Sequence, residues 1–81
     1  MDDPQIDTDL IDEMVLALMY LSLHGDKLET RAWKSFDWGS LARLHAKELI
    51  LDPVGKAKSV VLTEEGLNRS KEAFFRIFAR G

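Results

Sequence analysis

The feature that most constrains the fold is a pair of short β-like runs set between helical patterns. Residues 49–51 and 59–63 are rich in branched apolar side chains, as half-buried strands are. Residues 52–55, Asp-Pro-Val-Gly, have the composition of a type I turn. We therefore expect the two runs to pair as an antiparallel β-hairpin whose tip carries Lys56 and Lys58.

The first helical pattern covers residues 10–23, with Thr8 or Asp9 able to cap it. At 100° per residue its apolar side chains form two faces, and two apolar faces need two partners. One face holds Leu10, Met14, Ala17, Leu18 and Leu21, and the other holds Leu16, Met19 and Leu23. One of them can lie on the core of the domain, and the other can meet the C-terminal helix or a second subunit.

Two further helices follow from capping residues. Asp37 can cap a helix over residues 38–48, and Thr63 can cap a helix that begins at Glu64. The predicted buried face of the last helix consists of Leu67, Phe74, Ile77 and Phe78. Residues 25–36 are mixed and polar, and we expect a loop with a short helical turn there. The predicted fold class is mainly α with one β-hairpin.

Length and composition predict a single domain over residues 1–81, with residues 1–8 as a flexible acidic tail. The first nine residues hold four aspartates and no base, unlike a secretory signal. The longest apolar run, residues 14–21, is far shorter than a membrane span. The chain has no cysteine, so disulfides and thiolate metal sites are excluded and a cytoplasmic location is expected.

A chain of 81 residues removes only about 60–65% of its unfolded surface on folding, so a homodimer is expected. We assign to the dimer interface the second face of the first helix together with two phenylalanines of the last helix, namely Leu16, Met19, Leu23, Phe75 and Phe78. The alternative is that all of these side chains are covered within one subunit.

The order of elements carries a resemblance to a known class of regulators. Residues 38–67, about half of the chain, contain Leu41-x-x-Leu44-x-x-Lys47-x-Leu49-Ile50, the turn lysines and Val61-Leu62-Thr63-Glu64-Glu65-Gly66. This pattern resembles the recognition helix, wing and closing helix of MarR-type and PadR-type winged-helix regulators. Those families usually have glycine where this chain has Glu48.

The resemblance implies a winged-helix (winged helix-turn-helix) domain, in which residues 38–48 enter a DNA major groove and residues 52–59 form a wing. It also implies dimerisation through terminal helices. A second similarity covers the whole chain, especially residues 31–38 and 52–63, and is to a small bacterial family of unknown function.

The predicted function is therefore DNA binding, with a role as a transcriptional regulator, and double-stranded DNA as the partner. The residues expected to contact DNA are Ser40, Arg43 and Lys47 on the helix, Lys56 and Lys58 on the wing, and Arg31 and Lys34. A solvated helix face and turn lysines that keep an edge soluble would explain the same residues.

The alternative function is a protein–protein interaction or dimerisation module that uses the same scaffold without nucleic acid. The overall charge of −3 and Glu48 favour it. The two functions differ in one observable feature. If acids from the N-terminal segment cover Arg43 and Lys47, DNA reading by this helix becomes implausible.

No pattern in the chain indicates an enzyme, a cofactor, a metal or a small-molecule substrate. His24 and His45 lack the spacing of metal ligands. Trp33, Phe36 and Trp38 could form a stacking platform for a base or ligand, but aromatic residues at a helix junction more often plug the core.

Overall fold

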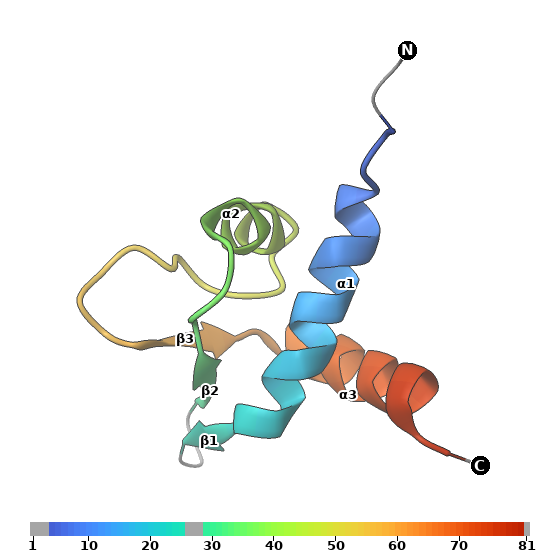
Figure 1. Ribbon diagram of the computed structural model, residues 1–81. Helices are drawn as coiled ribbons and strands as arrows, with labels where there is room; N and C mark the ends of the chain where they lie inside the picture. The colour runs from blue at the N-terminus through green and yellow to red at the C-terminus, as the bar shows by residue number, and fades with distance from the viewer. Residues whose placement is uncertain (1–3, 26–28, 81) are drawn as a thin grey trace.

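The computed structural model describes residues 4–25 and 29–80. Over these residues the order is helix α1 (Thr8–Met19), 3₁₀ helix η1 (Tyr20–Ser22), strands β1 (His24–Gly25) and β2 (Thr30–Trp33), helix α2 (Trp38–Ala46), strand β3 (Ser59–Leu62) and helix α3 (Glu64–Phe78). Helix α1 runs through the middle of the molecule, with α2 and the sheet on one side, and α3 crosses it (Figure 1). The chain is therefore a small mixed α/β domain. None of its described helices has the length and apolarity that a membrane span requires.

The sheet has three antiparallel strands in the order β1-β2-β3. The predicted pairing of residues 49–51 with residues 59–63 is present, but as a single bridge between Ile50 and Leu62. The Leu51 N–H donates to the Val61 carbonyl at 2.9 Å, and the Thr63 N–H donates to the Leu49 carbonyl at 3.0 Å. Strand β3 pairs over four residues with β2 instead. The predicted hairpin is therefore confirmed only around this one bridge.

Strands β1 and β2 lie within or next to residues 25–36, where the sequence predicted a loop with a short helical turn, so that prediction is wrong over residues 30–33. Residues 26–28 of this segment lie outside the described residues. Only Ala32 of β2 is buried, and its neighbours Arg31 and Trp33 are polar or exposed. A strand with one buried residue in four has no visible apolar alternation. It forms a strand because it pairs with β3 in the folded chain.

The ends of the helices follow from side-chain caps. The carboxylate of Asp37 accepts from the Ser40 N–H at 3.2 Å, and the Thr63 hydroxyl accepts from the Gly66 N–H at 3.0 Å, as predicted. Helix α1 is capped by Asp7 rather than by Thr8 or Asp9, at 2.9 Å from the Leu10 N–H. Helix α2 ends at Ala46, two residues before the predicted end.

Glu48 adopts a φ of 60°, so this position has the left-handed backbone that glycine would favour. The helix therefore ends at a residue with left-handed backbone, although this residue is not glycine. Of the predicted acidic tail, residues 4–7 are exposed and precede the first helix, whereas Thr8 is already the first residue of α1. Residues 1–3 lie outside the described part of the chain.

The core lies between α1, α2 and the sheet. It is formed by Val15, Leu16, Met19, Ala32, Leu41, Leu44, Leu49, Ile50, Val60 and Leu62, with Leu23, Phe36 and Leu67 packed against it. Leu16 is 3% exposed and Met19 is 0% exposed. The structure thus contradicts their assignment to a dimer interface, and Leu23 also packs against the core. The face of α1 that contains them is the inner one.

Helix α3 packs on α1 through small residues rather than through its aromatic side chains. Gly66, Ser70 and Ala73 are its buried residues. The Ser70 hydroxyl donates to the Leu16 carbonyl at 2.7 Å across the helix pair. Small side chains let the two backbones approach closely. Phe74 and Ile77 are therefore only half-buried and Phe78 is exposed, which corrects the predicted buried face.

A helix-turn-helix joins two helices by a turn of three or four residues. In the described residues, α1 and α2 are instead separated by η1, β1 and β2. The structure therefore supports only the general class of a small mixed α/β domain. A loop precedes β3 at the position where the wing was predicted.

Candidate functional site

The basic face of α2, predicted to read DNA, is turned toward α1. Arg43 donates from Nε to Asp12 Oδ2 at 2.6 Å and from Nη2 to Asp12 Oδ1 at 2.9 Å. This is the bidentate geometry in which a guanidinium binds a carboxylate most strongly. Asp12 is 1% exposed, and Ser40 beside it is also fully buried. Arg43 and Ser40 are therefore part of the junction between the two helices.

The environment of Asp12 favours its charged form. Burial alone would raise the pKa of this carboxyl, but the hydrogen bonds from Arg43 and Ser40 and the charges of Arg43 and Lys47 outweigh that effect. The pKa of Asp12 therefore lies below its ordinary value. The same contacts raise the pKa of the Arg43 guanidinium, chiefly through the hydrogen bond to Asp12. The pair is ionised throughout the neutral range.

Lys47, the third predicted reading residue on α2, also has an acidic partner on α1. Its Nζ lies 3.1 Å from Asp9 Oδ1, and both side chains are largely exposed. Such an exposed pair contributes little stability, but it places a carboxylate beside the lysine. Acids of the N-terminal helix thus cover the face of Arg43 and Lys47, which is the feature expected to disfavour DNA reading.

Two predicted DNA contacts near the wing are used to hold the sheet and the loop. Arg31 donates to the Ser59 hydroxyl at 2.7 Å and to its carbonyl at 3.1 Å, and it pairs with Glu29 at 3.0 Å. Lys34 donates from Nζ to the Pro53 carbonyl at 2.8 Å and to the Gly55 carbonyl at 3.1 Å. Both side chains therefore have structural partners within the chain.

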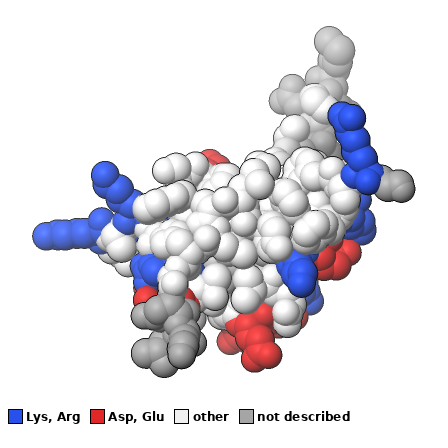
Figure 2. All heavy atoms as spheres, turned by 90° about the horizontal axis from the view of Figure 1, so that it is seen from below, with Lys and Arg blue, Asp and Glu red and all other residues white. Residues whose placement is uncertain are grey.

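Lys56 and Lys58 are the predicted contacts that point into solvent, and both are exposed. Seen from below, Lys and Arg side chains project at the end of the molecule where Figure 1 places the loop before β3 (Figure 2). Lys34, Lys56 and Lys58 line a hollow of about 600 Å³ together with Trp33, Ser35, Gly55 and Ala57. The structure thus gathers three of the seven predicted contacts at one place.

An exposed apolar surface runs along α1 into η1, on the face away from Asp12. We call it the α1 stripe and define it as Leu10, Ile11, Met14, Leu18 and Leu21. All five side chains are more than a third exposed, and Leu21 is 69% exposed. Ile6 extends the stripe toward the N-terminus, and a hollow of about 460 Å³ lies along it.

The sequence found both apolar faces of this helix but did not determine which one is buried. The signal that could have decided it is Asp12. A carboxylate on the same side as Leu16 and Met19 needs a basic partner when that side is buried. Arg43 is such a partner on the next helix. If the Asp12–Arg43 pair had been recognised in the sequence, the opposite face of the helix would have been the candidate interface.

Phe75 and Phe78, the other predicted interface residues, are about half exposed. They belong to an aromatic cluster at the end of α3. The ring centroids of Tyr20 and Phe75 lie 5.5 Å apart, those of Tyr20 and Phe74 lie 4.9 Å apart, and those of Phe74 and Phe78 lie 5.5 Å apart. Tyr20 is next to Leu21, so this cluster adjoins one end of the α1 stripe.

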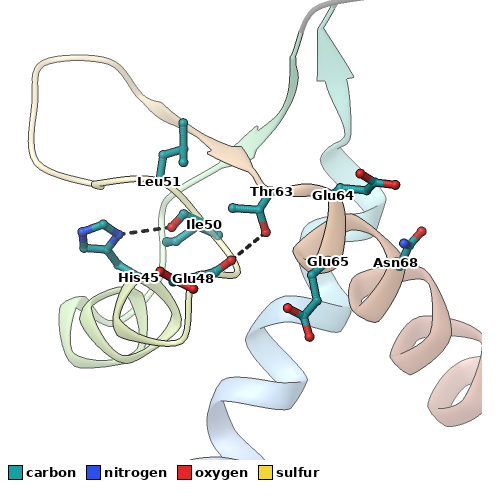
Figure 3. A pocket seen from close by; sticks show the side chains of 8 residues that line it. All are labelled: His45, Glu48, Ile50, Leu51, Thr63, Glu64, Glu65 and Asn68. Carbon is teal, nitrogen blue, oxygen red and sulfur yellow. Dashed lines mark hydrogen bonds between the residues drawn. The ribbon is translucent and has the colours of Figure 1, made fainter.

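A hollow of about 730 Å³ lies between the end of α2, the Ile50 bridge and the start of α3, and Figure 3 shows the side chains that line it. It is lined by His45, Glu48, Ile50, Leu51, Thr63, Glu64, Glu65 and Asn68. His45 Nδ1 lies 3.2 Å from the Ile50 carbonyl, and the Thr63 hydroxyl donates to the Glu48 carbonyl at 2.7 Å. The carboxylates of Glu64 and Glu65 point in different directions (Figure 3). These side chains do not converge on a common ligand position.

The described residues contain no group of three or more His, Asp or Glu side chains arranged for a metal ion. Phe36 packs against the core, as predicted. Trp33 and Trp38 are both about half exposed, so the prediction that they plug the core is wrong. The ring of Trp33 lies against that of His24, with centroids 4.7 Å apart.

Comparison with known proteins places the chain in a family. Residues 7–80 match the family described as a domain of unknown function, DUF6429, and the chain belongs to this family. It is 55% identical over 76 residues to the uncharacterized protein y4hR of Sinorhizobium fredii (strain NBRC 101917 / NGR234). That match covers 94% of this chain and 99% of the relative. No solved structure matches significantly. The predicted membership of a small family of unknown function is confirmed.

Proposed function

We propose that this chain is a protein-interaction module that forms a homodimer through the α1 stripe and does not read DNA with α2. The observation that carries the proposal is the division of α1 into two sides. Its acids pair with bases of α2 and α3 in the same chain, whereas the apolar side chains of the α1 stripe are exposed on the other side.

The paired acids matter because α1 is an acidic helix. Asp9 pairs with Lys47, Asp12 with Arg43, and Glu13 with Arg76 of α3. Two such helices would repel each other if these charges were exposed and unpaired. Because each acid within the helix has a basic partner in its own chain, the outer faces of two copies can meet without that repulsion.

The spacing of the stripe suits a second helix of the same kind. Ile11, Met14, Leu18 and Leu21 follow one another at intervals of three, four and three residues. This is the spacing of the apolar seam between two helices that pack side by side. A two-fold interface uses the same patch on both subunits, and the stripe provides such a self-complementary patch.

The size of the molecular surface also supports a second copy. The chain has an accessible surface of 5977 Å², whereas a compact monomer of this mass exposes about 4,900 Å². The exposed stripe contributes to this excess, and each partner in a standard interface contributes roughly 800 Å². The molecule is also thin, with extents of 51 × 37 × 19 Å.

The test is the dissociation constant of the dimer, measured by sedimentation equilibrium for the variant Leu18→Lys. A lysine in the middle of the interface would be buried without a partner in the dimer, which costs about 3 kcal/mol. The dissociation constant should therefore rise roughly a hundredfold. Lysine near the C-terminal end of a helix suits the helix dipole, so the monomer should stay folded.

The matched control is Val54→Lys, which makes the same change at an apolar side chain that is 71% exposed and lies on the loop before β3. This variant should dimerise as the wild type does. Equal weakening in both variants, or a wild-type chain that is monomeric in concentrated solution, would contradict the proposal.

A further inference from the structure

The hollow at the loop before β3 has the properties of a small binding site that lies apart from the α1 stripe. It is formed by the end of β2, through Trp33, Lys34 and Ser35, and by residues 55–58 of the loop. Its volume of about 600 Å³ is within the range of ligand pockets, about 300–1,000 Å³.

The electrostatics of this hollow favour an anion. Three lysines line it, and no acidic residue does. Lys34 donates to two backbone carbonyls, which are neutral, so its positive charge is not cancelled by an acid. Lys56 and Lys58 are exposed and are in none of the ion pairs of the described residues. An ammonium is a point charge that suits phosphate.

The loop that carries these lysines is held in place. The Lys34 side chain donates hydrogen bonds to the Pro53 and Gly55 carbonyls of the loop, and the Lys34 backbone N–H donates to the Lys58 carbonyl at 3.1 Å. Gly55, with a φ of 145°, makes the turn between the two bonded segments. A fixed loop loses little entropy on binding, so the charges are arranged before a ligand arrives.

The remaining feature is a flat apolar surface next to the charges. Trp33 is 52% exposed and lines the hollow. The contact with His24 limits how its ring can rotate. An exposed aromatic ring beside basic side chains is one arrangement by which proteins bind single-stranded nucleic acid, because a base stacks on the ring and the phosphate meets the positive charges.

We propose that this hollow binds a nucleotide unit, with the base on Trp33 and the phosphate at Lys56 and Lys58. The unit can be a free nucleotide or part of a single strand, since the shared chemistry is a ring next to a phosphate. A base within a duplex cannot stack on Trp33 without leaving its pair, so single strands should bind better than duplexes.

The experiment measures fluorescence anisotropy of a labelled single-stranded oligothymidylate at low salt. Lys56→Ala/Lys58→Ala should weaken binding at least fivefold, because two phosphate contacts are lost. The charge-matched control Lys71→Ala/Arg80→Ala removes two exposed bases of the α3 region and should change the affinity less than twofold. If the two double variants weakened binding equally, net charge alone would explain the binding, and the proposal would be overturned.

A second readout isolates the stacking. The chain has two tryptophans, so Trp33 is the only one left in the variant Trp38→Phe. Its fluorescence should be quenched by the oligonucleotide, and Trp33→Ala should weaken binding about tenfold. Trp33→Phe should retain most of the affinity. Competition by ATP but not by inorganic phosphate identifies a free nucleotide as sufficient, and competition only by strands identifies a polymer. Tighter binding of duplex DNA, or equal competition by inorganic phosphate, would overturn the proposal.

Discussion

The variant Arg43→Met is expected to melt roughly 15 °C or more below the wild type. Asp12 is 1% exposed and has Arg43 as its bidentate partner. Removing the guanidinium leaves a buried carboxylate without its partner, which is among the most destabilising single changes in a folded protein. Thermal unfolding followed by circular dichroism measures the effect.

Two further variants make this result specific. Arg69→Met breaks an exposed pair with Glu65 on α3 and should change the melting temperature by only a few degrees. The double variant Asp12→Leu/Arg43→Met removes both charges and should recover most of the loss, because a well-packed apolar pair replaces a buried ion pair at little cost. If Arg43→Met were as stable as Arg69→Met, Arg43 would be free for another partner.

The variant Gly66→Ala is expected to lose about 3 kcal/mol of stability, or roughly 10 °C or more in melting temperature. A Cβ on Gly66 would overlap the carbonyl group of Leu49. That carbonyl also accepts hydrogen bonds from the Thr63 N–H and hydroxyl, so it cannot move without breaking the start of α3. Chemical denaturation with urea measures the loss.

Gly39→Ala is the control for this prediction. A Cβ on Gly39 meets only the ends of the Asp37 and Arg43 side chains, which can shift more easily than backbone. The variant should therefore lose much less stability than Gly66→Ala. Equal losses would mean that the close approach of α3 to Leu49 does not constrain the fold.

Local signals in the sequence were sufficient to predict the helices. Asp37 and Thr63 were identified as caps because their side chains are short acceptors directly before an apolar periodic segment, and both cap in the structure. Asp7 was missed because Thr8 and Asp9 are equally good caps by type. Such choices between neighbours depend on where the first turn packs.

Tertiary contacts determine the features that could not be predicted from the sequence. Strand β2 has too little apolar alternation to be recognised, and it becomes a strand because β3 pairs with it. The rotation of α1 is set by the Asp12–Arg43 pair, between residues that are 31 positions apart. This rotation changes the candidate interface. Leu16 and Met19, which were predicted at the interface, are buried, whereas Leu10, Met14 and Leu18 are exposed.

The same pair also bears on how the basic residues of α2 are interpreted from the sequence. On a helical wheel Ser40, Arg43 and Lys47 form a basic face of the kind that reads DNA. Their partners, Asp9 and Asp12, lie on a different helix, so no spacing within α2 indicates that this face is covered. By contrast, Lys56 and Lys58 lie on a loop and stayed exposed, as turn lysines commonly do.

The most direct test of the central claim is the rate at which hydrogen peroxide oxidises Met14 in the wild-type chain. Met14 lies in the exposed α1 stripe, whereas Met19 is 0% exposed and serves as the internal standard. Peptide mass spectrometry reports sulfoxide formation at each residue. If two copies cover the stripe, Met14 in a concentrated solution should be nearly as slow as Met19, and Leu18→Lys should restore its reactivity. Fast oxidation of Met14 in the concentrated wild-type protein would contradict the account.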